Sequence, residues 1–486
     1  MNSPATDVTS AGLLAPSGQP VRSRGAAFAL LAAVQLVVIL AMSMLSVCLT
    51  RIRSDFHASD ELLALVTAAY AMSFSGLLLL GGRQADSGNP RRWVERGVLL
   101  FAVGSLICMV APSMAVLLVG RFVQGAASAL AVPAAMALVH ALYPEPERHS
   151  RAMAVWGVLT GLGGILGLLY GGVVSDSLSW RWTFTLPLLV SAIVLGMSRR
   201  TLPLPVRTDS TPLDLVGAVT ATVALASLSY GLVIAPIEGW TSPQVLVSIV
   251  LGCVSAIAFV AWEKRTADPL LPPELVKSGS RVVALVAVFL AAASITTIFY
   301  MLSLYFQDVF GWNPLQTSFG FLPIGIGLLA TSLSVGRLMS AQGPRRVLVL
   351  GLLIAALGLW LIGGIGPDSR YLGTLLVGLA VFPVGAALTF SAATVLGMRD
   401  SQASEAGRVG GVISAAMEAG PTLGLSILVS LAAVVSGHQH GVDAPAAMAS
   451  GFSVGLRVAA VVLAVASIGV LTWSRRSASG AASRSA

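Results

Sequence analysis

Long apolar stretches recur along almost the whole chain, and their length limits what it can fold into. A helix of about 17–25 apolar residues crosses the hydrocarbon core of a bilayer, which is about 30 Å thick. Inside lipid every backbone N–H and C=O must be bonded within the protein, so these stretches form helices. Fourteen of them occur, at residues 25–49, 62–82, 97–113, 115–142, 152–176, 182–198, 213–235, 244–262, 282–306, 315–336, 346–364, 371–396, 408–435 and 453–473. The sequence therefore predicts an all-α polytopic membrane protein with 14 transmembrane helices.

The charges agree with this fold and give it an orientation. Only 10% of the 486 residues are charged and 56% are hydrophobic, which excludes a soluble globular protein. With the N-terminus inside the cell, 23 of the 29 basic residues fall on the cytoplasmic side, as the bias of Lys and Arg in short loops predicts. The formal charge of +8 therefore needs no nucleic-acid partner. We expect a multi-pass protein of the bacterial inner membrane with both termini cytoplasmic. Five arginines are left on the outer side: Arg51, Arg53, Arg181, Arg370 and Arg457.

Two internal echoes indicate that the chain is built from related halves. Residues 82–92 and 336–346 both begin with Gly-Arg and end with Pro-Arg-Arg, without a gap between them. Residues 163–168 resemble residues 420–425 in the same order along the chain. We therefore expect six-helix bundles over 25–200 and 281–474, joined by a linker, 201–280, that carries two extra helices at 213–235 and 244–262. Residues 1–24 and 475–486 are expected to be cytoplasmic tails, the first of them disordered.

Arg121 lies inside an otherwise apolar span, and such a charge needs a reason. An arginine in the membrane costs about 2.5–3.5 kcal/mol on insertion scales, so it normally faces a bundle interior or a wet cavity. The alternative is that its side chain snorkels to the outer interface, about 10 Å away. Gln124 lies one turn deeper on the same face, which favours the interior.

Glu418 is the other deep charge, ten residues into the span 408–435. A carboxylate at that depth is costly to keep ionised, so it can exchange a proton as access to it alternates. Pro421 removes the N–H that would bond to the carbonyl of Met417, and this can bend the helix beside the glutamate. The alternative is a structural glutamate bonded to a neighbouring helix, including one paired with Arg121.

Several stretches together resemble a known family. They are residues 121–125 (RFVQG), 179–184 (SWRWTF), 268–271 (DPLL), 304–307 (LYFQ) and 321–323 (FLP). The chain resembles the fourteen-span drug:proton antiporter branch of the major facilitator superfamily (MFS), whose members include multidrug and antibiotic exporters. The resemblance implies two pseudo-symmetric six-helix bundles in a 6+2+6 arrangement, with the substrate cavity between them near the membrane midplane. It further implies export of amphiphilic organic compounds by proton antiport through alternating access.

The same resemblance assigns roles to two groups of residues. A gating loop would consist of Gly82, Asp86, Arg91 and Arg92, although Asn89-Pro90 displaces the family's usual glycine. A positive-inside loop with a simple turn is the alternative reading. An antiporter-motif helix would carry Gly163, Gly167, Gly171 and Gly172. Two departures stand out, because Ala41 replaces the family's span-1 aspartate and Leu168 replaces a proline. Glu418 is therefore expected to supply the missing proton-coupling carboxylate, together with Arg121 and Gln124.

The remaining candidates concern ligands. An apolar substrate cavity is expected from Phe299, Tyr300, Tyr305, Gln307 and Met417, with lipid-facing or packing roles equally open for each. The three cysteines lie in apolar runs and His438 and His440 lie in an outer loop, so neither a metal site nor a cofactor is expected.

The predicted partners are a small organic substrate, protons and the lipid bilayer, with the chain acting as a monomer. Two rival functions stay open. A proton-independent facilitator or importer is favoured by the missing span-1 acid. A membrane enzyme or sensor is disfavoured, because deep nucleophiles, bases and metal ligands do not converge in the sequence.

Overall fold

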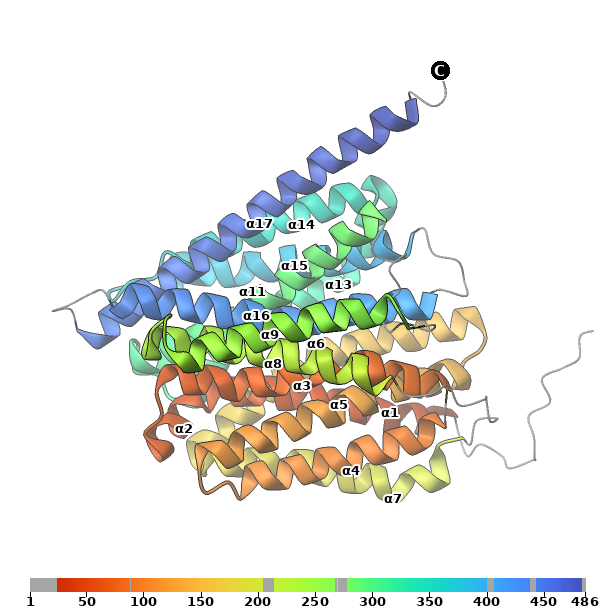
Figure 1. Ribbon diagram of the computed structural model, residues 1–486, viewed down its shortest axis with the longest axis horizontal. Helices are drawn as coiled ribbons and strands as arrows, with labels where there is room; N and C mark the ends of the chain where they lie inside the picture. Colours follow the sequence, from red (N-terminus) through yellow and green to blue (C-terminus); the bar gives the residue numbers. More distant parts are fainter. Residues whose placement is uncertain are drawn as a thin grey trace, which may run out of the picture.

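The computed structural model describes residues 24–87, 89–203, 214–266, 269, 278–399, 406–437 and 443–482. Three predicted features lie outside these ranges: the tail before Arg24, the pair His438 and His440, and the 268–271 motif except Pro269. Within them, every regular element is helical (Figure 1).

The first helices run from Arg24 to Thr201. They are α1 (Arg24–Ser43), the 3-10 turn η1 (Met44–Val47), α2 (Leu49–Phe56), α3 (Asp60–Ser87), α4 (Pro90–Met109), α5 (Met114–Leu142), α6 (Pro146–Ser177), the 3-10 turn η2 (Trp180–Phe184) and α7 (Thr185–Thr201). Two helices follow, α8 (Leu215–Glu238) and α9 (Pro243–Glu263). The last set comprises α11 (Gly279–Asp308), α12 (Pro314–Gly320), α13 (Leu322–Gln342), α14 (Pro344–Ile362), the π-turn η3 (Tyr371–Leu375), α15 (Leu376–Met398), α16 (Ala406–Gly437) and α17 (Ala444–Ala482).

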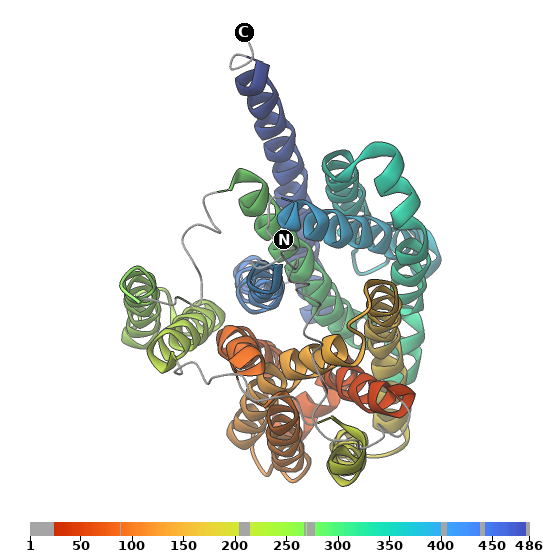
Figure 2. The same cartoon turned by 90° about the vertical axis from the view of Figure 1, so that its right-hand side faces the viewer.

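The helices form two groups with a pair between them. Helices α1 and α3–α7 pack on one another, and we call α1–α7 the N-terminal group. Helices α11–α17 likewise form a C-terminal group. Helices α8 and α9 pack together, and α8 contacts both α3 and α16, so the pair lies beside the line where the groups meet (Figure 2). The start of α1 and the end of α17 lie at one end of the molecule, and α2 lies at the other (Figure 1).

Twelve helices of the described part are long and apolar enough to cross a membrane. Helix α4 is not among them, because Arg91, Arg92, Glu95 and Arg96 occupy its first two turns. In α6 only Leu162–Ser177 is apolar over the residues that can be described. The predicted span 315–336 is divided at Phe321 between α12 and α13. The membrane fold is thus confirmed, and the count of 14 stays a prediction.

Close helix contacts are made through glycines. A side-chain carbon added at Gly167 would lie 2.0 Å from Ser43 Oγ, and one at Gly171 would lie 2.3 Å from the carbonyl oxygen of Met44. Helices α1 and α6 therefore touch almost backbone to backbone. Small residues have this role in membrane proteins, where lipid offers no hydrophobic force between helices.

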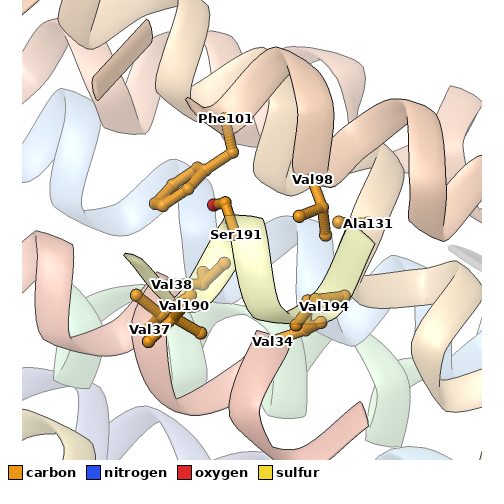
Figure 3. Close-up of a pocket in the computed structure, with 9 residues that line it drawn as sticks. All are labelled: Val34, Val37, Val38, Val98, Phe101, Ala131, Val190, Ser191 and Val194. Carbon is orange, nitrogen blue, oxygen red and sulfur yellow. The ribbon is translucent and has the colours of Figure 1, made fainter. Parts of the chain in front are cut away.

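One small void lies inside the N-terminal group (Figure 3). Its lining comes from α1, α4, α5 and α7 and consists of Val34, Val37, Val38, Val98, Phe101, Ala131, Val190, Ser191 and Val194. Ser191 is the single polar residue of these nine, and the cavity measures about 10 Å³. That volume holds one water molecule at most, so the void is a packing defect and not a substrate site.

The glycine contact can be tested on α6 itself. We expect Gly171→Ala to lower the stability by about 1–3 kcal/mol, because the backbone of η1 at Met44 cannot easily withdraw from the added methyl group. Gly164→Ala is the matched control, since nothing lies within 4 Å of its added carbon. It should leave the apparent melting temperature in detergent unchanged or slightly raised. Equal melting temperatures for the two variants would contradict the close contact between η1 and α6.

Candidate functional site

Arg121 lies in the interior of the N-terminal group. Its side chain is almost fully buried, at 1% exposure. Nη1 donates to Gln124 Oε1 at 2.9 Å and to the carbonyl of Ala41 at 3.2 Å, and Nε donates to the carbonyl of Val66 at 3.5 Å. The guanidinium carbon lies 4.7 Å from the ring centre of Tyr70, which is a cation–π distance. The guanidinium therefore does not snorkel to an interface.

Gln124 extends this contact into a polar network across three helices. Its Nε2 donates to Ser105 Oγ on α4 at 2.8 Å. Its backbone carbonyl accepts from Ser128 Oγ at 2.9 Å, and that hydroxyl lies 2.6 Å from Tyr70 Oη on α3. All of these side chains are buried, so water does not compete for the bonds and each is stronger than at a surface.

The charge of Arg121 has no acidic partner in the described part of the chain. No Asp or Glu oxygen there lies within 4 Å of its nitrogens, so an ion pair between Arg121 and Glu418 is not formed. The place where the resemblance expects an aspartate is occupied by Ala41, which contributes its backbone carbonyl to the guanidinium. The positive charge is stabilised by neutral acceptors and an aromatic face.

Glu418 lies on α16 of the C-terminal group. Helix α16 packs against α8 and against α3, the helix of Tyr70. Glu418 is partly exposed, and Met417 beside it is 37% exposed. Helix α3, which carries Tyr70, thus contacts both α5, which carries the cation, and α16, which carries the carboxyl. Pro421 lies within α16, which continues past it as one helix.

The residues of the predicted gating loop lie around the end of α3 and the start of α4. Asp86 belongs to the last turns of α3, and its side chain lies outside the described part. Gly82 has open space on its side-chain face. Arg91 donates to Glu95 Oε1 at 3.1 Å and to the carbonyl of Leu202 at 3.4 Å, whereas Arg92 is exposed.

The departure at Asn89-Pro90 in this loop has a local explanation. Asn89 caps α4 by accepting from the N–H of Arg92 at 3.3 Å, and Pro90 occupies the first helical position. The pair therefore forms a helix start where the family has a glycine, and the gating role stays a prediction.

The glycines of α6 face two directions. Gly163 and Gly167 face α1 and Gly171 faces η1, whereas a carbon added at Gly172 would lie 2.1 Å from Ser318 Oγ on α12. Ser318 Oγ also donates to the carbonyl of Leu168 at 2.7 Å. Helix α6 thus joins the two groups at this point, and Ser318 is a contact that the sequence did not single out.

The five predicted cavity residues are distributed over separate places. Tyr300 and Tyr305 are fully buried, and Tyr305 Oη donates to the carbonyl of Gly366 at 2.6 Å. Gln307 contacts the η1–α2 segment, whereas Met417 lies on α16 beside Glu418. Phe299 packs on Phe321 with ring centres 5.1 Å apart. Their common role as a substrate cavity stays a prediction.

Comparison with known proteins accounts for this architecture. The model of the Major Facilitator Superfamily matches residues 31–425. The chain belongs to this superfamily. The puromycin resistance protein pur8 of Streptomyces alboniger is 33% identical to it over 452 residues, which cover 89% of each protein. The cephamycin export protein CmcT of Amycolatopsis lactamdurans is 32% identical over 399 residues, covering 81% of this chain and 82% of the relative.

The fold is shared with a solved transporter of low sequence identity. A bacterial homologue of the human drug peptide transporters PepT1 and PepT2 superposes with a TM-score of 0.66 at 16% identity, covering 93% of this chain and 99% of the other. The chain is therefore an MFS transporter with drug-exporter relatives, not an enzyme, and the predicted family is confirmed.

Arg121 gives the first functional prediction. Arg121→Ala should abolish drug tolerance in an efflux-deficient host, because the buried acceptors and the Tyr70 face lose their cation. Membrane insertion should be intact, since a costly charge is removed. Arg121→Lys should rescue poorly, because an ammonium cannot reproduce the planar fork. Arg199→Ala, at an exposed arginine near the end of α7, is the control. Full tolerance in the alanine variant, at equal protein levels on immunoblots, would show that the charge is dispensable.

Proposed function

We propose that the protein exports an amphiphilic organic compound, such as an antibiotic, drug or secondary metabolite, across the bacterial inner membrane. Transport would proceed by alternating access and be driven by proton antiport. The observation that carries the proposal is the packing of α16, which carries the partly exposed Glu418, against α3, whose Tyr70 ring lies against the buried Arg121. The relatives named for puromycin resistance and cephamycin export support the direction and the substrate class.

We further propose the full 6+2+6 arrangement of 14 spans. Helices α4 and α6 pack against helices that are long enough to cross the membrane, so they would cross it as well. The α1 start and the α17 end lie at the same end of the molecule, as an even number of spans requires (Figure 1). The distribution of Lys and Arg supports a cytoplasmic position for that end.

The proposed coupling uses Glu418 as the proton carrier. A carboxyl at membrane depth is more stable when it is neutral, so Glu418 would favour its protonated form. Substrate release and proton uptake would then favour each other at this one site. When the groups rock, Glu418 would meet water from alternate sides. A proton that crosses 100 mV supplies about 2.3 kcal/mol, which can drive a substrate against its gradient. The protein would do this as a monomer, since both groups belong to one chain.

A proton-independent facilitator or importer is the second candidate. The observation that favours it is Ala41, which offers only a backbone carbonyl where the family places an acid. Counterflow in vesicles without a pH gradient separates the two, because only a facilitator would keep its full rate there.

Glu418 is tested by two substitutions. Glu418→Gln mimics the protonated form and should remove gradient-driven export while leaving substrate binding or downhill exchange measurable. Glu418→Asp should keep some coupling with a shifted pH profile. The control is Glu238→Gln, at an exposed glutamate that ends α8. The measurement is substrate uptake into inverted vesicles with and without an uncoupler. Uphill transport by the Gln variant with the wild-type pH dependence would assign the coupling proton to another group.

The orientation has its own test. Reporters fused after residue 10 and after residue 480 should both be active on the cytoplasmic side, because an even number of spans returns the chain to its starting side. Activity outside the cell at either position would contradict the 14-span topology.

A further inference from the structure

Several polar contacts join the two helix groups at α2, which lies at one end of the molecule (Figure 1). Arg53 Nη1 on α2 and Asp308 Oδ2 at the end of α11 lie 2.7 Å apart and form an ion pair. Thr50 on α2 donates to Gln307 Oε1, and Gln307 Nε2 donates to the carbonyl of Val47 at 3.3 Å. These bonds join segments that are more than 250 positions apart in the sequence, separated by 255 positions for Arg53 and Asp308.

Helix α2 is held firmly on the N-terminal side. Asp55 Oδ2 accepts from Trp180 Nε1 at 2.8 Å and from Arg181 Nη1 at 2.6 Å. Burial acts to raise the pKa of Asp55, but the bonds from Trp180 and Arg181 and the charge of Arg181 together hold it below its usual value. Asp55 is therefore ionised at neutral pH. Phe56 packs edge-on against Trp180 with ring centres 5.8 Å apart.

The opposite partner is held by an aromatic cluster in the C-terminal group. Gln307 and Asp308 are the last two residues of α11 and directly follow Phe306. The ring of Phe306 lies 4.9 Å from that of Trp312 and 6.0 Å from that of Tyr371. The end of α11 is thus fixed against the turn before α12 and against η3, so its two polar side chains point from a rigid base.

We propose that Thr50, Arg53, Gln307 and Asp308 form a latch, here called the α2 latch, which holds the two groups closed at this end. The latch must break each time the transporter opens there, so the proposal rests on the alternating-access part of the proposed function. It also gives a role to two stretches that the family resemblance left without one. Residues 179–184 anchor α2, and residues 304–307 brace its partner.

The strength of the ion pair suits a contact that has to break. The side chains of Arg53 and Asp308 are 26% and 24% exposed. An ion pair in that setting is stronger than a fully solvated pair, which contributes little, and it avoids the desolvation of a fully buried one. The ion pair therefore stabilises the closed state by a modest free energy, and the transporter can still open at this end.

The test measures opening directly. Spin labels are placed at Ser177→Cys, at the end of α6, and at Asp368→Cys, between α14 and η3, after the native cysteines Cys48, Cys108 and Cys253 are replaced by serine. Both labelled positions are exposed and lie outside the latch. Distance distributions are then recorded by pulsed electron paramagnetic resonance on the full chain in nanodiscs, without substrate.

Arg53→Ala and Asp308→Asn should each raise the ratio of long to short distances by about threefold to tenfold, the range of a coupling free energy of about 1 kcal/mol. The exchanged pair, Arg53→Asp with Asp308→Arg, should return the distribution towards that of the parent, which excludes misfolding as the cause. Arg51→Ala, at an exposed arginine of the same helix, is the matched control and should change nothing.

Two results would overturn the latch. The first is a distance distribution for Arg53→Ala and Asp308→Asn that equals the distribution for Arg51→Ala. The second is an exchanged pair whose distribution stays shifted to long distances. The readout does not depend on transport. A drug panel that shows no efflux together with a shifted distribution would reject the proposed function and keep the latch.

Discussion

Helix contacts through backbone atoms are the interaction on which the rest of this structure depends. Lipid is as apolar as a leucine side chain, so helices in a membrane are held by close packing and internal bonds rather than by exclusion from water. Gly125 shows the consequence, since a carbon added to it would lie 2.1 Å from the carbonyl oxygen of Tyr70. The same approach of α3 to α5 brings the Tyr70 ring beneath the Arg121 guanidinium. The polar network around Arg121 therefore exists because two backbones touch.

The second constraint follows from the first: every buried polar group needs a hydrogen-bond partner inside the protein. A buried guanidinium has five N–H donors and must find acceptors nearby. Arg121 finds Gln124, two backbone carbonyls and an aromatic face. At the end of the molecule that carries α2, the side chains are partly exposed and can use full charges, and there the contact is an ion pair of Arg53 and Asp308. Whether a contact uses neutral acceptors or an ion pair therefore depends on how deeply it is buried from water.

The sequence predicted what depends on spacing and local chemistry. Span lengths gave the membrane fold, and the polar face of Arg121 and Gln124 indicated an interior site. The glycines of α6 were singled out by the family resemblance, and their close contacts came only with the structure. The missed contacts join distant segments, such as Ser318 with the carbonyl of Leu168, 150 positions away. Backbone acceptors such as the Ala41 carbonyl are also invisible in a sequence, because every residue has one. Arg53 and Arg181 looked like exceptions to the charge rule until their partners, Asp308 and Asp55, were in view.

The isolation of Arg121 has an electrical consequence. A guanidinium stays protonated in proteins, and no acid of the described chain neutralises this one at contact distance. A full elementary charge carried across 100 mV does about 2.3 kcal/mol of work, so a movement of α5 through one tenth of the membrane field involves about 0.2 kcal/mol. The rocking of the N-terminal group would then produce a small displacement current and respond to the membrane voltage. This chain would sense voltage through a group that carries no proton in the cycle.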